Sequence, residues 1–299
     1  MPKRALVIGG SGFLGSHVAD ALSHAGMDVT IFDHAESLWA SSEQKFIQGD
    51  LLDKSAILSA CEGMNYVYHM AGIADIGEAS ENPLRTIESN VMGSSIVLSA
   101  CVEQGVERFV FASTVYVYSQ RGSFYRASKQ SVETLIEAYH EKYDLNYTIL
   151  RYGSLYGPRA QDWNGFKNYI LQAVNNNKIV CNGTGEERRE YIHVKDASRL
   201  SVEALQDDFE NKCLTLTGAQ VLKVKELFSF IKEIVGKDIQ FEFEEPGGES
   251  DHYLLTPYRY TPRQAVKIEP RTFVDIGQGV LDVVEEITAD SQESAKRAL

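Results

Sequence analysis

The N-terminal segment of the chain constrains its fold more than any other stretch. An unbroken apolar run over residues 4–8 passes into the glycine-rich segment 9–15 and then into a helical stretch over residues 16–22. Glycines after a buried strand let the backbone turn tightly and approach a pyrophosphate, and the helix that follows offers free N–H groups. The spacing is G-x-G-x-x-G from Gly10 and G-x-x-G-x-x-G from Gly9. This order predicts a dinucleotide-binding turn.

A second strand supplies the acidic residue that such a site requires. Residues 28–32 are expected to form this strand, which ends in Asp33 about twenty residues after the glycines, where a carboxylate binds the ribose 2′-hydroxyl. Asp33 would repel a 2′-phosphate. The sequence therefore favours NAD over NADP as the cofactor.

The following segments alternate between the residue patterns of strands and of helices. We expect strands over residues 45–48, 65–70, 108–113 and 147–151, and helices over residues 53–61, 83–104 and 125–143. Strands that alternate with crossover helices are typical of a parallel, doubly wound sheet. The predicted fold class is α/β, a doubly wound parallel sheet (Rossmann) with a smaller mixed α/β C-terminal substrate lobe.

The pattern loosens after Pro158 into shorter elements. We expect residues 1–156 to form the NAD-binding domain, to which the chain returns around residues 190–206, and residues 157–288 to form mainly the substrate lobe. Residues 289–299 are polar and lack an apolar stripe, so we expect a frayed tail.

Composition excludes several classes of partner. A net charge of −13 offers no basic footprint for nucleic acid or an anionic membrane. The chain lacks a signal-peptide core and a run long enough to span a membrane. The four cysteines are far apart in apolar surroundings, and His193 and His252 have no second ligand at metal spacing. We therefore expect no metal, free buried thiols and a cytoplasmic location.

Three residues form a candidate catalytic group. Tyr125 and Lys129 are four residues apart on a predicted helix, hence on one face, and Thr114 follows the strand that ends at Ser113. Removing a hydride from a secondary alcohol needs a base for the hydroxyl proton, and a tyrosine phenolate can act as one when nearby cations stabilise it. Lys129 and the oxidised nicotinamide would supply that charge, and Thr114 would hold the reacting oxygen.

Short motifs along nearly the whole chain match one known family. They are Gly9-x-x-Gly12-x-x-Gly15, Asp33, Gly49-Asp50-Leu51, His69-Met70-Ala71-Gly72, Ser113-Thr114, Tyr125-x-x-x-Lys129, Arg151-Tyr152 and Tyr156-Gly157-Pro158-Arg159. With these motifs the chain resembles the extended short-chain dehydrogenase/reductases, in particular their nucleotide-sugar epimerase/dehydratase branch. The resemblance implies that Thr114, Tyr125 and Lys129 form the catalytic triad. It implies a cofactor site made by Gly9, Gly12, Phe13, Leu14, Gly15, Asp33, Asp50, Leu51, Met70, Ala71, Gly72, Tyr125, Lys129 and Tyr152.

The resemblance also implies substrate contacts. The stretch from Gly183 to Asp196 looks like the family's G-x-G…R-x-F-x-x-V-x-D element, whose arginine grips the nucleotide diphosphate, so Arg189 is the candidate here. Relatives usually carry an asparagine at the position of Ser154, so Ser154 either contacts the phosphate with less reach or the contact is lost. Thr114 and Tyr116 are the other expected substrate contacts. In relatives, the helices equivalent to residues 83–104 and 125–143 of each subunit form a homodimer interface, and we expect a homodimer here too.

Two departures from the family bear on the reaction. The loop over residues 119–124 is shorter than relatives usually have, which should alter the mouth of the pocket. Val115 and Tyr116 stand where sugar 4,6-dehydratases carry Asp-Glu and nucleotide-sugar decarboxylases carry Glu. Tyr116 is either a second acid/base or a wall of the substrate pocket, and we favour the wall.

The sequence thus predicts an NAD-dependent enzyme that oxidises a nucleotide-diphosphate sugar at C4. The leading reading is a nucleotide-sugar 4-epimerase, and a 4-dehydrogenase or ketoreductase with net redox change is the alternative. A noncatalytic NAD-sensing protein on the same fold is a rival of another class. Arg189 disfavours a steroid- or flavonoid-type reductase.

Overall fold

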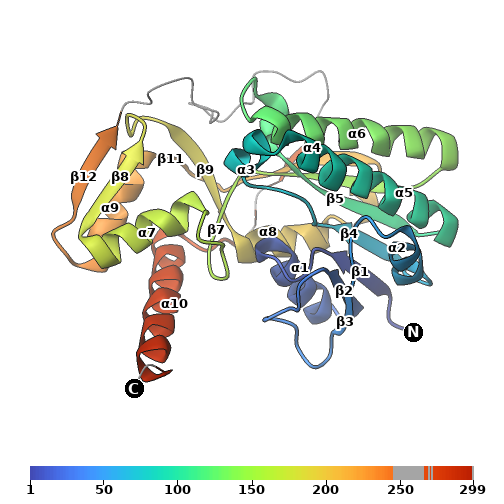
Figure 1. The fold of residues 1–299 in the computed structure, drawn as a ribbon, viewed down its shortest axis with the longest axis horizontal. Helices are drawn as coiled ribbons and strands as arrows, with labels where there is room; N and C mark the ends of the chain where they lie inside the picture. The colour runs from blue at the N-terminus through green and yellow to red at the C-terminus, as the bar shows by residue number, and fades with distance from the viewer. Residues whose placement is uncertain (245–265, 269, 271, 298–299) are drawn as a thin grey trace. The chain divides into compact units, whose positions relative to one another are not determined.

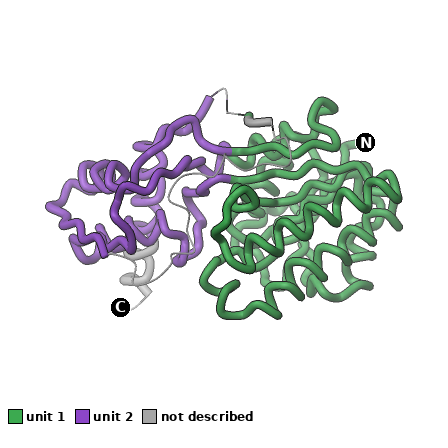
Figure 2. The backbone as a smooth tube through the Cα atoms, turned by 90° about the horizontal axis from the view of Figure 1, so that it is seen from above, with its two compact units in different colours: residues 1–152, 197–216, 257–268 green, residues 153–196, 217–256, 269–299 purple. Residues whose placement is uncertain are grey.

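The computed structural model describes residues 1–244, 266–268, 270 and 272–297. The chain forms two compact units, each built from non-contiguous segments (Figure 2). Unit 1 comprises residues 1–152, 197–216 and 257–268, and unit 2 comprises residues 153–196, 217–256 and 269–299. His252 lies outside the described residues.

Unit 1 is built on an eight-stranded sheet with the order β13-β10-β6-β5-β4-β1-β2-β3 (Figure 1). All neighbouring strands are parallel. The chain leaves β1 to one side for β2 and β3 and then crosses to β4 on the other side, which is the switch point where α/β sheets bind ligands. This architecture confirms the predicted doubly wound sheet. The strands are β1 (Arg4–Ile8), β2 (Asp28–Asp33), β3 (Lys45–Gln48), β4 (Tyr66–His69), β5 (Arg108–Thr114), β6 (Tyr147–Tyr152), β10 (Lys212–Leu216) and β13 (Val266–Ile268).

Helices cover both faces of this sheet (Figure 1). On one face, α2 (Lys54–Cys61), α5 (Gly93–Gln104) and α6 (Ser123–Tyr143) pack with the strands into the main apolar core. On the other face lie α1 (Phe13–His24) and α8 (Val194–Glu203), the latter of which begins in unit 2. The shorter helical segments in this part of the chain are α3 (Ile76–Glu81), α4 (Pro83–Thr86), η1 (Ile87–Met92), η2 (Val115–Tyr118) and η3 (Asp207–Phe209).

The single helix that we expected over residues 83–104 is divided by a π-helical segment, η1. The extra residue in this turn accompanies an inward-facing amide. Asn90 is buried and bonds the backbone of Ile73, accepting from its N–H at 2.7 Å and donating to its carbonyl at 3.0 Å. π-Turns of this kind are frequent at functional sites.

Unit 2 carries two small sheets, of order β11-β9-β7 and β12-β8. Its apolar core lies between these sheets and three helices. The elements are β7 (Ser154–Tyr156), α7 (Gly165–Asn176), β8 (Lys178–Asn182), β9 (Arg188–His193), β11 (Val221–Lys223), α9 (Val224–Val235), β12 (Gln240–Glu244) and α10 (Ile276–Arg297).

We expected a frayed tail over residues 289–299, and the structure describes a helix over most of that segment. Helix α10 continues to Arg297. The segment lacks an apolar stripe but is rich in Ala, Glu, Gln, Lys and Arg, which are strong helix formers and can extend a helix that packing has already nucleated. Among the described helices, none is long and apolar enough to cross a membrane.

Candidate active site

The turn after β1 is shaped so that only glycine fits at two of its positions. Gly9 has φ +85°, and a Cβ there would lie 2.5 Å from the Ala71 backbone nitrogen. A Cβ on Gly15 would lie 2.1 Å from the Gly9 carbonyl oxygen. Gly12 is the N-cap of α1, which starts at Phe13. The turn packs closely on the strand end and on the helix. An anion can therefore approach the N–H groups at the N-terminus of α1.

Asp33 lies at the end of β2, beside this turn. Its carboxylate is mostly buried, with Oδ2 accepting from the Ser11 N–H at 3.0 Å and Oδ1 accepting from the Ala35 N–H at 3.2 Å. These bonds hold the carboxylate in one orientation against the glycine turn. This is the arrangement in which it can accept from a ribose hydroxyl.

A pocket of about 350 Å³ opens at this edge of the sheet in unit 1. Its volume is in the range of small-molecule sites. Six of the predicted cofactor residues line it: Gly9, Asp33, Asp50, Leu51, Ala71 and Gly72. The glycine cradle, the oriented carboxylate and the pocket together fit the adenosine part of a dinucleotide.

Other cofactor predictions fall outside the lining of this pocket. Gly12, Phe13, Leu14 and Gly15 form the start of α1, and Met70 follows β4. The hydroxyl of Tyr152 pairs with Ser201 Oγ at 2.6 Å within unit 1, and burial raises its pKa. Other residues of the lining were not among the predicted cofactor residues, including His34, Arg85, Glu88 and Ser89.

The three predicted catalytic residues belong to neighbouring elements of unit 1. Thr114 is the last residue of β5 and caps η2, its Oγ1 accepting from the Tyr116 N–H at 3.2 Å. Tyr125 and Lys129 lie on α6, with the Lys129 Nζ 5.9 Å from the centre of the Tyr125 ring. The Tyr116 ring meets the Tyr125 ring edge-on at 6.2 Å between centroids.

Lys129 is buried, and its amine is fixed in place. Nζ donates to the Ala112 carbonyl at 2.8 Å and lies 4.8 Å from the centre of the Phe111 ring. Burial lowers the pKa of Lys129 to about 8, while the charge of Glu133 acts in the opposite direction. The amine can therefore stabilise a nearby phenolate as a cation at neutral pH.

Lys129→Met should alter how stability depends on pH. Between the folded pKa of about 8 and the ordinary value of 10.5, the unfolded chain holds a proton on Lys129 that the folded chain has released. The stability contributed by this group is therefore complete above about 10.5 and is lost as the pH falls through 8. In urea unfolding over this range, the free energy of unfolding of wild type should rise by roughly 3 kcal/mol relative to that of Lys129→Met as the pH increases. A difference between the two proteins that stays constant with pH would contradict this.

Asn90 and Ser128 connect the cofactor edge to the catalytic helix, and the sequence did not identify either. Asn90 Nδ2 donates to Ser128 Oγ at 3.0 Å, and Ser128 Oγ donates to the Tyr125 carbonyl at 2.8 Å. A Cβ on Gly72 would lie 2.8 Å from Asn90 Oδ1. The residue types are common in helices, so only the three-dimensional structure reveals this connection.

The other two predicted substrate residues, Ser154 and Arg189, belong to unit 2. Ser154 on β7 pairs with Tyr191 on β9, and Arg189 precedes Tyr191 by two residues. Because side chains alternate along strands, the register places these three on the same face of the small sheet.

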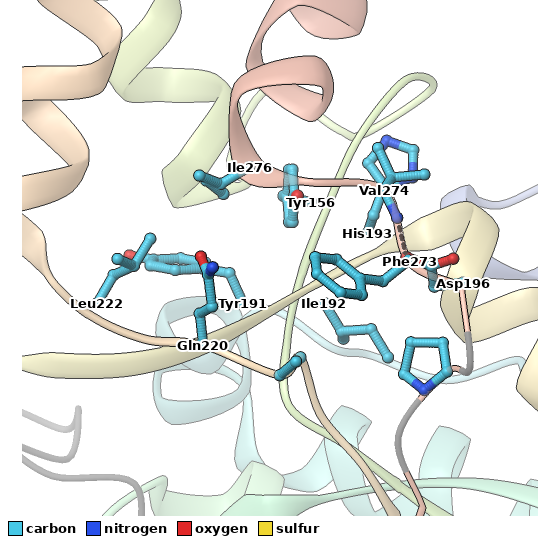
Figure 3. Close-up of a pocket in the computed structure, with 13 residues that line it drawn as sticks. Tyr156, Tyr191, Ile192, His193, Asp196, Gln220, Leu222, Phe273, Val274 and Ile276 are labelled. Carbon is cyan, nitrogen blue, oxygen red and sulfur yellow. Dashed lines mark hydrogen bonds between the residues drawn. The ribbon is translucent and has the colours of Figure 1, made fainter.

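Unit 2 also contains a small pocket, to which neither Ser154 nor Arg189 contributes (Figure 3). It is lined by β7, β9 and the segment before α10, and the Val274 N–H donates to the Asp196 carboxylate at 2.8 Å beside it. Its volume of about 30 Å³ suits a water molecule or two rather than a nucleotide sugar. His193, also on its lining, is buried.

The fold of unit 1 is the dinucleotide-binding fold of the short-chain dehydrogenase/reductase type. The chain belongs to the NAD dependent epimerase/dehydratase family, whose model matches residues 5–213. Its cofactor is accordingly NAD.

Relatives within this family carry out different reactions. A UDP-N-acetyl-alpha-D-glucosaminuronate decarboxylase of Bacillus cytotoxicus is 27% identical over 276 residues, which cover 82% of this chain and 85% of the relative. A dTDP-D-glucose 4,6-dehydratase of Mus musculus is 28% identical over 261 residues, which cover 77% of this chain and 74% of the relative. A UDP-glucose 4-epimerase of Thermotoga maritima, solved with UDP-glucose, matches at a TM-score of 0.85 and 25% identity, over 96% of this chain and 99% of that one.

Proposed function

We propose that this protein is an NAD-dependent 4-epimerase of a nucleotide-activated sugar. The observation that carries the proposal is the environment of Tyr125. The first two residues of η2 are Val115, which is buried, and Tyr116, which packs against the Tyr125 ring. The site thus combines the groups for oxidising an alcohol with an apolar and aromatic wall.

The chain's own residues have separate roles in this reaction. Bound NAD supplies the acceptor that takes a hydride from the sugar and returns it. Tyr125 removes the proton of the C4 hydroxyl, and Lys129 stabilises the resulting phenolate. Thr114 Oγ1 accepts from a backbone N–H, so its own proton remains available to hold the sugar oxygen. Tyr125 would return the proton to the C4 oxygen as the C4 epimer forms.

Dehydration would need more acid/base groups than Val115 and Tyr116 provide. After the C4 ketone forms, a 4,6-dehydratase must remove a proton at C5 and protonate the departing C6 hydroxyl, which requires two positioned acid/base groups besides the tyrosine. Val115 can perform neither step, and Tyr116 is one group where two are needed. We infer that the chemistry stops at the C4 ketone or returns from it.

The alternatives differ in what happens to the cofactor. A 4-dehydrogenase or ketoreductase uses the same three residues, but it converts one molecule of NAD to NADH, or of NADH to NAD, for each sugar that reacts. A noncatalytic NAD-sensing protein would have no use for a buried Lys129 beside Tyr125, since burying an amine is costly without a function for it. The epimerase and its redox alternative are separated by whether NADH accumulates.

Arg189 and Ser154 are the proposed contacts to the nucleotide diphosphate. They share a face of the small sheet in unit 2 through the register with Tyr191. A guanidinium can bind two phosphate oxygens in parallel, and a serine hydroxyl can add one bond. Incubation with a panel of nucleotide sugars, followed by mass spectrometry and cofactor absorbance, tests the proposed function.

Asp33 should make the protein prefer NAD to NADP. The oriented carboxylate would repel the 2′-phosphate of NADP. Asp33→Ala should narrow the preference by removing the repulsion, measured as the ratio of the two dissociation constants by calorimetry. The exposed Asp28→Ala on the same strand is the control, because its carboxylate pairs with Lys45. Equal affinities of wild type for both cofactors would refute the assignment.

We expect a homodimer formed through residues 83–104 and 125–143. Three apolar side chains are exposed along the first of these segments: Leu84, Ile87 and Met92. Exposed apolar clusters of this kind mark interaction surfaces. Leu84→Glu should shift the protein toward monomer in light scattering, whereas Leu38→Glu, at an equally exposed leucine in a loop, should not. A monomeric wild type at micromolar concentration would rule out the dimer.

A further inference from the structure

Glu133 is a deeply buried carboxylate that the proposed reaction does not use. It follows Tyr125 and Lys129 on α6 at the same four-residue spacing, so the three share one face of the helix. Only 2% of Glu133 is exposed. A charge buried to this extent is stable only if the surrounding groups compensate for it.

Both oxygens of this carboxylate are engaged. Oε1 accepts from Arg151 Nε at 3.0 Å and from Ser113 Oγ at 2.5 Å, and Oε2 accepts from Arg151 Nη2 at 2.6 Å. The paired contact to Arg151 has the fork geometry of a strong, oriented ion pair. A carboxylate held in this way acts through the groups to which it binds, not by exchanging a proton with substrate.

The bond to Ser113 reaches the part of β5 that serves the catalytic residues. The residue before it, Ala112, provides the carbonyl that accepts from Lys129 Nζ at 2.8 Å. The residue after it is Thr114. Helix α6 and the end of β5 are therefore tied together at two adjacent residues, by Lys129 to Ala112 and by Glu133 to Ser113.

Arg151 extends the same network to the turn that bears Tyr116. Its Nη1 donates to the Tyr118 hydroxyl at 2.6 Å, and that hydroxyl also pairs with Thr215 Oγ1 at 3.2 Å. Tyr118 is the last residue of η2. The ion pair thus fixes both the strand end with Thr114 and the turn that follows it.

Glu133 also supplies negative charge near Lys129. The other titratable groups that face the amine are Tyr125 on its own helix and His69 on β4, with Arg151 on β6 beyond the Glu133 carboxylate. Burial lowers the pKa of His69 to about 3, so this imidazole is neutral near pH 7. The charge of Glu133 is what opposes the effect of burial on Lys129.

We propose that Glu133 is a positioning residue of this active site, which holds the end of β5 in place for Lys129 and Thr114 and keeps Lys129 charged beside Tyr125. The proposal rests on the proposed function, in which charged Lys129 stabilises the Tyr125 phenolate. It assigns to Glu133 an effect on Lys129 that a merely structural ion pair would not have.

The test is the titration of Lys129 in the folded protein without any sugar. Protein labelled with ¹³C at the lysine Cε is titrated by NMR, and Lys129→Met identifies the signal. Glu133→Gln keeps the shape of the side chain but removes its charge, so Lys129 should lose its proton about one pH unit lower than in wild type. The double variant Glu133→Gln/Arg151→Met removes the carboxylate charge together with the guanidinium charge that partly offsets it, so it should show a smaller downward shift, and it avoids the unpaired buried guanidinium that could make the single variant fold poorly.

Tyr118→Phe is the matched control. It removes the bond from Arg151 to the phenol while the Glu133 charge stays in place. Its Lys129 signal should titrate as in wild type. An unchanged Lys129 titration in both Glu133→Gln and the double variant would overturn the proposal, whether or not the enzyme turns over a sugar. Wild type that forms no epimer would refute the proposed function and leave this titration as a separate result.

Discussion

Tyr125→Phe should lower the rate of C4 epimer formation by about a thousandfold, the effect of removing a positioned general base. The substitution deletes one oxygen and little volume, so the ring can still pack against Tyr116. NAD binding should stay within a few-fold of wild type, because the glycine turn and Asp33 are unchanged. The measurement is the initial rate of epimer formation by NMR, with calorimetry of NAD as the check on binding.

Tyr116→Phe is the comparison that gives this result its meaning. If Tyr116 is a wall of the pocket, removing its hydroxyl should slow the reaction by less than about tenfold, since no proton transfer depends on it. A loss as large as that of Tyr125→Phe would instead make Tyr116 a second acid/base. Retention of most activity in Tyr125→Phe would contradict the assignment of the base.

Arg151→Met should destabilise the protein by about 3–5 kcal/mol, as expected when one partner of a buried ion pair is removed. Arg151 is 1% exposed, and the substitution leaves the buried Glu133 carboxylate with only the Ser113 hydroxyl of its described partners. The free energy of unfolding in urea measures the loss. Adding Glu133→Gln to this variant should recover part of the stability, because the uncompensated charge disappears.

An exposed ion pair provides the control for Arg151→Met. Lys45 pairs with Asp28 at 3.0 Å on the surface of the same unit, with the lysine side chain 66% exposed. Lys45→Met should change stability by no more than about 1 kcal/mol. Equal losses of unfolding free energy in Arg151→Met and Lys45→Met would mean that the buried network contributes no more to stability than an exposed ion pair.

The parts of the site that the sequence could predict are those whose residues are close together in the sequence. The glycine turn, Asp33 at the end of the next strand and the Tyr125–Lys129 spacing each depend on a few neighbouring residues. Local conformation fixes these features, and the structure places the glycine turn before α1, Asp33 at the end of β2, and Tyr125 and Lys129 on α6. The alternation of strands and helices likewise predicted the doubly wound sheet of unit 1.

The parts that the sequence could not predict depend on contacts between distant segments. Glu133 and Arg151 are ordinary charged residues until the helix and the neighbouring strand are placed side by side. The π-turn at Asn90 is hidden because the apolar spacing of residues 83–104 is compatible with a regular helix.

The central claim is that oxidation at C4 is followed by return of the hydride to the same carbon. The most direct test is incubation of the protein and NAD with UDP-glucose, UDP-N-acetylglucosamine and UDP-glucuronic acid in deuterated water, followed by NMR and mass spectrometry of the sugar. The account predicts the C4 epimer of at least one of them at unchanged mass, with no deuterium at C5 and no accumulation of NADH. Loss of water with deuterium at C6, NADH formed in step with a keto sugar, or NAD binding without change in any of the sugars would contradict it.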